Sequence, residues 1–337
     1  MTAALHGAGT QHKGTEMKKQ LQSQKRINSK AMQTILAFSS LILLFLIFSL
    51  ASPVFLTSSN LVAILLMTAV NGILAVGITF IIVSGGIDLS VGTVMTFGSV
   101  IAGVCCTNLH LPLWLGIICS ILAGVLCGFV NGVTIAYLKL PPFIATMGMM
   151  NITRGLNLVI TDSRPIYFTE TPAFLKIAIA PVAGIPLGAL IFFLCAGIAA
   201  FLLSKTVIGR YCYSIGSNEE STRLSGINTN KWKIAIYSMS GAFFGIAGIV
   251  MASRVASAQP SLGAGYEMNA IAAAVIGGAS LSGGEGSILG TIIGAFIITV
   301  LTNGLRILSV PQEWQMVVTG LIIIGAVYLD IIRRKVK

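Results

Sequence analysis

Charged side chains are scarce in this sequence. Asp, Glu, Lys and Arg together make up 9% of the 337 residues, whereas a soluble globular domain carries about 25%. With 55% hydrophobic residues and a mean hydropathy of +0.92, the chain has too few polar side chains for a water-facing surface. The composition excludes a soluble domain and indicates a polytopic membrane protein, in which about 20 apolar residues make one span.

Signatures of catalysis and metal binding are also missing. The sequence contains no Gly-x4-Gly-Lys-Ser/Thr phosphate loop, no His-Glu-x-x-His and no Gly-x-Ser-x-Gly, so ATP hydrolysis and hydrolytic chemistry have no motif in this chain. The six cysteines show no ligand or disulfide spacing and are interpreted as small hydrophobic residues. We therefore expect no enzyme activity, no metal and no cofactor.

The net charge of +11 is concentrated at three places: residues 1–30, residues 205–232 and residues 333–337. Basic residues beside membrane spans favour the cytoplasmic side, which predicts cytoplasmic tails at both termini and a cytoplasmic loop at 205–232. They do not form a patch interleaved with aromatic residues, so nucleic-acid binding is not indicated. No convincing cleavage site follows the first apolar run, and we expect it to be retained as a span.

Ten apolar segments follow one another between residues 31 and 332, which we interpret as one transmembrane domain. The predicted fold is an all-α polytopic bundle of about ten helices with interrupted or re-entrant segments. Segment 141–159 contains Arg154, and segment 268–281 is short enough to be re-entrant. The ten lie near 34–52, 61–83, 89–107, 113–138, 141–159, 184–204, 233–253, 268–281, 286–309 and 314–332, with 160–183 and 254–267 predicted outside the cell.

Asp88 is the only acid between residues 31 and 138, where there is also no Lys or Arg. It follows Gly85-Gly86-Ile87, a sequence that predicts a broken helix which restarts near the acid. Two roles remain open for the carboxylate: it caps the next helix, or it binds a hydroxylated solute or relays protons along a membrane path. The candidate path or helix-break residues are Gly85, Gly86, Asp88, Ser90, Asn71 and Asn303, although amides inside spans can also join helices.

A weak internal echo links residues 85–92 with residues 277–284, which share Gly-Gly-x-x-Leu-Ser-x-Gly. Either the chain contains an internal repeat with two interrupted helices, as many transporters do, or abundant Gly and Ser produce the match by chance. Ser282 and Glu285 have capping-box spacing, so Glu285 is expected to cap a helix.

The loop at 205–232 contains a second capping box, with Ser217 as the N-cap and Glu220 reaching back to it. Acids in its first turn and a Gly after its last residue predict a short surface helix over 218–225. Such a helix is either a docking element for a soluble partner or an ordered loop without one. The residues concerned are Ser217, Asn218, Glu219, Glu220, Arg223 and Gly226.

Several separated stretches, in this order, resemble the permease subunits of ribose-type bacterial ABC monosaccharide importers. They are residues 84–92 (SGGIDLSVG), 209–227 (GRYCYSIGSNEESTRLSGI), 257–260 (SAQP), 265–267 (GYE) and 270–284 (AIAAAVIGGASLSGG). Asn303-Gly304-Leu305 and the last apolar segment fit as well. The resemblance extends from about residue 61 to residue 330.

The resemblance implies a permease in the bacterial inner membrane that works as a dimer with a second copy or a paralogue. A cytoplasmic ABC ATPase would supply the energy through the helix around 217–226, and a periplasmic binding protein would deliver the sugar. Polar residues predicted outside are candidates to contact that binding protein, or else belong to a solvated loop. They are Asp162, Arg164, Glu170, Lys176 and Arg254.

The sugar itself stays open among ribose, allose, another pentose or hexose, and a sugar-like signal. The main rival is an ion-coupled secondary carrier that uses Asp88 as its coupling acid. A passive channel is a further alternative, which predicts flux without saturation or energy coupling.

Overall fold

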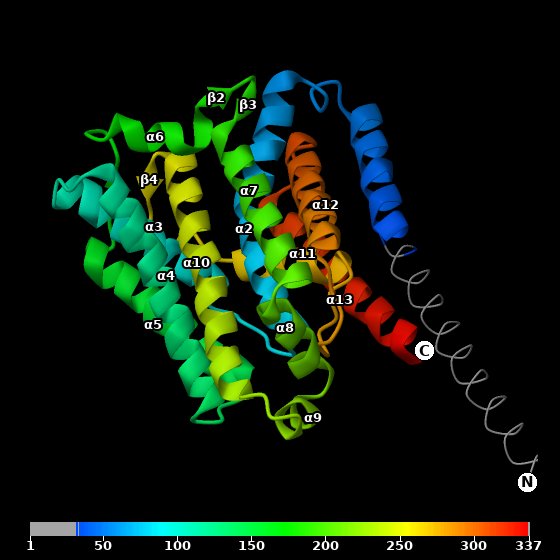
Figure 1. Ribbon diagram of the computed structural model, residues 1–337. Helices are drawn as coiled ribbons and strands as arrows, with labels where there is room; N and C mark the ends of the chain where they lie inside the picture. Colours follow the sequence, from blue (N-terminus) through cyan, green and yellow to red (C-terminus); the bar gives the residue numbers. More distant parts are fainter. Residues whose placement is uncertain (1–31, 33, 336–337) are drawn as a thin grey trace, which may run out of the picture.

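The described part of the chain is a bundle of helices with very little strand (Figure 1). A computed structural model describes residue 32 and residues 34–335, so the predicted basic tail 1–30 lies outside the described residues. Every one of the ten predicted segments contains a helix. Within the described residues, eight helices are long and apolar enough to cross a membrane. They are Thr34–Ala51, α2 (Ser58–Val83), α3 with the π-helical η1 (Val91–Asn108), α4 (Leu113–Ala136), α5 (Pro142–Thr161), α7 (Leu187–Lys205), α10 (Thr229–Val255) and α12 (Ile288–Ile307).

The segment that contains Arg154 and the segment short enough to be re-entrant form helices of different length. Segment 141–159 forms α5, a 20-residue helix that includes Arg154 and is long enough to span. Segment 268–281 forms α11 (Tyr266–Ile276), which has only 11 residues and stops well before residue 281. At 1.5 Å per residue α11 is about 17 Å long, roughly half of a bilayer core. Helix α13 (Gln312–Lys335) completes the set, and the all-α polytopic fold is confirmed.

Helix α2 forms the centre of the bundle. From Thr68 to Val83 every residue is buried, because α10, α12, α7 and α11 surround the helix. A helix that is hydrophobic on all sides belongs in such a position. Helices α4 and α5 bury a smaller share of their residues, and α4 turns Leu122, Leu126 and Phe129 outward.

Helices α4 and α10 pack through a row of small residues. On α4 a small residue recurs every four positions, and a side chain at Gly124 would clash with the backbone of Gly241. Ser120 donates a hydrogen bond to the carbonyl oxygen of Gly245 across the same contact. Small residues allow two helix backbones to approach closely in a membrane, where no hydrophobic force holds helices together. The α4 residues in contact with α10 are Ser120, Gly124, Gly128 and Gly132, whereas Gly116 faces Ala102 and Cys106.

Short irregular elements lie at the end of the bundle opposite to α9 (Glu219–Leu224), where Figure 1 shows α6 and β2–β4. The predicted external stretch 160–183 contains β1 (Ile166–Tyr167), α6 (Pro172–Ile179) and β2 (Pro181–Val182). Strand β1 pairs antiparallel with β4 (Ser257–Ala258), and β2 pairs with β3 (Ile185–Pro186). We call these two ends of the bundle the α6 end and the α9 end.

Two helices end in the same way, as the sequence echo suggested. Gly85 after α2 and Gly278 after α11 have φ angles of +83° and +94°, and their N–H groups bond to carbonyls three residues back. The next residue in each case bonds to a carbonyl five residues back, which completes a glycine-terminated C-cap. Gly85 therefore corresponds to Gly278 and not to Gly277, so the sequence match is out of register by one residue.

Candidate functional site

The predicted cytoplasmic loop folds into two helices instead of one. Helix α8 (Val207–Ser217) comes first, and α9 (Glu219–Leu224) follows after a single residue. Helix α8 buries Gly209, Cys212 and Ile215 on one face, a spacing of three that is typical of an amphipathic helix. This helix was not predicted, although that spacing is present in the sequence.

The predicted capping box at α9 is wrong in its register. Asn218 is the N-cap, and its side chain accepts the N–H of Ser221 at 2.8 Å. Ser217 is instead the last residue of α8. Glu220 turns toward Arg223 at 2.7 Å, which raises the pKa of the guanidinium above its usual value. Gly226 has a φ of +84° just beyond the helix, so the predicted glycine stop is confirmed.

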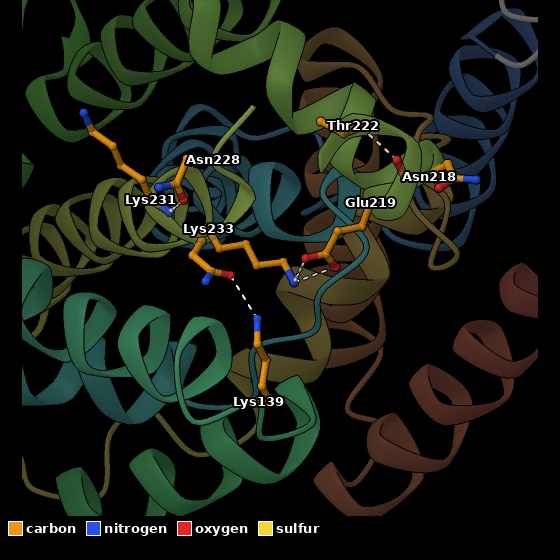
Figure 2. A network of polar contacts seen from close by, with 8 residues as sticks. Lys139, Asn218, Glu219, Thr222, Asn228, Lys231 and Lys233 are labelled. Atoms are coloured by element: carbon orange, nitrogen blue, oxygen red, sulfur yellow. Dashed lines mark hydrogen bonds and ion pairs between the residues drawn. The ribbon is translucent and has the colours of Figure 1, made fainter. Parts of the chain in front are cut away.

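An ion pair holds α9 against the start of α10, and a hydrogen bond joins the start of α10 to the turn between α4 and α5 (Figure 2). Glu219 and Lys233 form an ion pair at 2.7 Å in which the Lys233 side chain is only 18% exposed. Lys139, in the turn between α4 and α5, donates to the side chain of Asn230 at 3.1 Å. Partial burial protects the Glu219–Lys233 pair from the screening that weakens exposed ion pairs. The α9 end is thus fastened to two spans.

Helix α8 contacts both helix breaks directly. A side chain at Gly216 would clash with the carbonyl oxygen of Val83, the last residue of α2. Gly284 donates its N–H to the same carbonyl at 2.8 Å, and Tyr213 donates its hydroxyl to the carbonyl oxygen of Gly286 at 2.8 Å. The end of α2, the loop after α11 and α8 therefore meet at one place, so a displacement of α8 must reach both breaks.

Asp88 lies in the loop between α2 and α3 and is 1% exposed. One carboxylate oxygen accepts the N–H of Ser90 at 2.7 Å and its hydroxyl at 2.6 Å, and Asn131 donates to the other oxygen at 3.5 Å. Ser90 and not Asp88 occupies the N-cap position of α3, so the acid orders the turn before the helix.

A cavity of about 350 Å³ opens at the α9 end beside this loop. Gly85 and Gly86 contribute to its wall, together with Tyr237, Glu219 and Lys233. The hydroxyl of Tyr237 is buried and has no hydrogen-bond partner among the described residues. Two of the candidate path residues therefore border open space, whereas Asp88 and Ser90 are buried and do not line the cavity.

The remaining candidate path residues do not join this group. Asn71 is buried in the middle of α2, and Asn303 lies near the other end of α12. The side-chain amide of Asn303 donates to Asn60 at 3.0 Å, which joins α12 to the first turn of α2. An interhelical bond of this kind is the ordinary role of amides within membrane helices.

The five predicted external residues lie at the α6 end: three between α5 and α6, Lys176 within α6 and Arg254 at the end of α10. Asp162, Arg164, Glu170 and Lys176 are exposed, and Glu170 lies 3.9 Å from His110. Arg254 is half-buried, and one of its guanidinium nitrogens has no hydrogen-bond partner among the described residues. Four of the five are thus accessible to a partner at this end.

Two features of the α9 end were missed from sequence. Leu224, at the end of α9, is 78% exposed, which is unusual for a leucine in a capped helix outside the spans. Lys233 was assigned only to the basic cluster and not to an ion pair with Glu219. The i to i+14 separation of this pair gives no local signal, since side chains contact within a helix only at i+3 or i+4.

Comparisons with known proteins give consistent results. A family model described as "Branched-chain amino acid transport system / permease component" matches residues 60–327. The ribose import permease of Haemophilus influenzae is 42% identical over 297 residues, 87% of this chain and 92% of that protein. The ribose import permease of Bacillus subtilis is 43% identical over 315 residues, 92% of this chain and 97% of that protein.

A more distant relative is named for a different sugar. The xylose transport system permease of Escherichia coli is 32% identical over 365 aligned positions, which cover 90% of this chain and 93% of that protein. No solved structure matches the chain.

Proposed function

This chain belongs to the ribose-type permease family of ABC sugar importers, and from this premise we propose that α9 is the coupling helix of such an importer. It would dock on a cytoplasmic ABC ATPase, whose ATP-driven closure displaces α9. The permease itself is a multi-pass protein of the inner membrane.

The fastening of α9 is the observation that supports this proposal most strongly. Helix α9 is exposed at Glu220 and at Leu224, yet Lys233 ties it to α10. Helix α8 precedes α9 immediately and contacts the ends of α2 and of the loop after α11. A partner that grips α9 would therefore move both helix breaks, which is what coupling requires.

The distribution of charge supports the sidedness. Basic side chains at the α9 end favour the cytoplasm for this end, with both termini on the same side. They are Lys139, Lys205, Arg210, Arg223, Lys231 and Lys233. The α6 end would then face the periplasm, where Asp162, Arg164, Glu170 and Lys176 are accessible to a sugar-binding protein and Arg254 is half-buried.

Ribose and xylose are the first sugars to test, because the relatives are named for them. The path would form between this chain and a second permease copy or a paralogue, surrounded by membrane lipid. Gly85 and Gly86 would border its cytoplasmic mouth, where the cavity of about 350 Å³ lies.

The test is to purify the tagged permease in mild detergent from its native host and identify co-purifying chains by mass spectrometry. We expect a stoichiometric ATPase with a phosphate loop, and we expect the combined change Glu220→Lys and Gly226→Val to remove it. Gly184→Val is the matched control, since Gly184 (φ +82°) and Gly226 (φ +84°) are equally strained and open, but Gly184 lies at the α6 end.

Retention of the ATPase by the double variant, with membrane insertion intact, would contradict the assignment of α9. A permease that purifies alone and transports in sealed vesicles without ATP would favour an ion-coupled carrier instead. The burial of Asp88, which does not line the cavity, speaks against that alternative.

A further inference from the structure

The segment between α10 and α11 runs into the interior of the bundle, although the sequence predicted an external loop. Ala258 lies against Gly103, the last residue of α3, and Gly263 lies against Gly92 near its start. Eleven helical positions separate these glycines, which is about 16 Å along α3. Residues 258–263 connect these two contacts in the direction opposite to α3, and a turn in which the Leu262 N–H bonds to the carbonyl oxygen of Gln259 lies between them.

Figure 1 gives the depth of this segment. There α11 crosses the bundle about midway between the α6 end and the α9 end, and its end at Gly277 packs on Gly290 in the first turn of α12. Its first turn at Tyr266 and Glu267 therefore lies near the middle of a hydrocarbon core about 30 Å thick. A carboxylate and non-helical backbone are therefore both present at mid-membrane.

Part of this segment is not covered by the rest of the chain. Ser261, Ala264 and Gly265 are exposed, and Glu267 is half-buried. The carboxylate oxygens of Glu267 accept the N–H of Gly265 at 3.1 and 3.2 Å, which leaves further acceptor capacity on a group with about four lone-pair sites. Irregular backbone and a carboxylate at this depth cannot face lipid, so they border protein or water.

Helix α5 places further polar groups on the other side of the start of α3. Thr153 donates a hydrogen bond to Thr93 at 2.7 Å, and the neighbouring residues on α5, Asn151 and Arg154, are exposed. An exposed amide and an exposed guanidinium within a membrane helix favour a polar surface over a lipid-facing one. Donors from α5 and an acceptor at Glu267 thus flank the same part of α3.

We propose that residues 257–267, closed by a second permease copy, form the mid-membrane wall of the sugar path, and that Glu267 accepts hydrogen bonds from sugar hydroxyls. Charge-assisted bonds from hydroxyl groups to a carboxylate are short and directional, which suits a polyol that must leave water. Asn151 and Arg154 provide further donors on the α5 side of α3. This inference rests on the proposed function, because it requires a transported sugar and a dimer.

The first test measures uptake in proteoliposomes that contain permease, ATPase and binding protein, with labelled ribose and xylose as the probes. Glu267→Gln keeps an acceptor for the Gly265 N–H, so the fold and the co-purification of the ATPase should persist. We expect uptake to fall at least tenfold, and unequally for the two sugars, which loss of a helix cap would not produce. Glu313→Gln, on the exposed start of α13, should transport like the wild type.

The second test measures whether the segment contacts water. Ala264→Cys should react with a charged, membrane-impermeant thiol reagent, and the transported sugar should slow the reaction. Peptide mass spectrometry would measure modification of the introduced cysteine separately from that of the native cysteines. Leu126→Cys, on the outward face of α4 and 60% exposed in the single chain, should stay unmodified because it faces lipid.

Unchanged uptake by Glu267→Gln, or an Ala264→Cys that never reacts, would overturn this inference, and the second result would indicate a dry subunit interface. Either outcome leaves the importer assignment intact. A wild-type protein without ATP-driven uptake of a sugar would instead mean failure of the proposed function.

Discussion

Two carboxylates lie beside the start of α3, and their surroundings differ sharply. Asp88 is 1% exposed, and the Ser90 N–H, the Ser90 hydroxyl and Asn131 engage its two oxygens. Glu267 is half-buried, bonds to the N–H of Gly265 and borders exposed non-helical backbone. A buried acid with its acceptors occupied orders a turn, whereas an acid with free capacity at an open surface is available to a solute.

The contact between Gly92 on α3 and Gly263 in the segment before α11 should be the most sensitive to substitution. Gly92→Val would drive a side chain into the backbone of Gly263 and toward Glu267, where neither side can yield. Overpacking costs about 1–3 kcal/mol, so we expect the upper end of that range and poor accumulation of folded protein. Fluorescence-detected gel filtration after heating would measure it.

Gly197→Val is the control for that change, since nothing lies within 4 Å of a side chain at this position on α7. Equal loss of stability in both variants would show that valine in the helix, and not the contact with Gly263, causes the effect.

Asp88 should behave as a structural acid. Asp88→Ala removes the acceptor for Ser90 and Asn131, and unsatisfied buried groups of this kind cost about 1–3 kcal/mol. Asp88→Asn retains an acceptor for the Ser90 N–H, and asparagine serves this turn as well as aspartate. We expect a clearly lower melting temperature for the alanine variant only, and equal melting of both variants would contradict the structural role.

The ion pair at the α9 end should matter less to folding than to the order of α9. Lys233→Met breaks the partly buried pair with Glu219, and we expect amides 219–224 to exchange hydrogen about fivefold faster, equivalent to about 1 kcal/mol. Arg223→Met breaks the exposed pair with Glu220 and should leave exchange unchanged. Faster exchange in the second variant alone would show that the wrong pair was identified as the anchor.

The smallest effect is expected for the amide contact between α2 and α12. Asn303→Ala removes the bond to Asn60, and interhelical hydrogen bonds in membrane proteins average about 0.6 kcal/mol. A shift of the unfolding midpoint in a denaturing detergent should just be detectable, and uptake should be retained. Loss of uptake without loss of stability would restore Asn303 as a path residue.

Hydropathy predicted all ten helical segments, because apolar length is written directly into the sequence. It could not place residues 257–267, since Ser, Gln, Pro and Gly are typical both of an external loop and of a non-helical stretch inside a bundle. Only the contacts of Gly263 with Gly92 and of Ala258 with Gly103 distinguish the two. Long-range backbone contacts of this kind leave no periodic pattern.

Local capping chemistry predicted that a short helix follows residue 217 but not which residue caps it. Ser217 and Asn218 are both good N-cap residues, and the continuation of α8 through Ser217 decides between them. The second predicted box fails for a similar reason: α12 begins only at Ile288, with Ser287 as its cap. In both places tertiary packing of the preceding segment selects among acceptable caps.

The most direct measurement compares Asp88→Asn and Glu267→Gln side by side, as ATP-driven pentose uptake in the same proteoliposomes with the same ATPase and binding protein. Both substitutions neutralise one acid near the start of α3 and keep its shape. The account predicts uptake within about threefold of wild type for Asp88→Asn and a loss of at least tenfold for Glu267→Gln, equivalent to about 1.4 kcal/mol or more. The reverse order would contradict it and make Asp88 the acid that handles the solute.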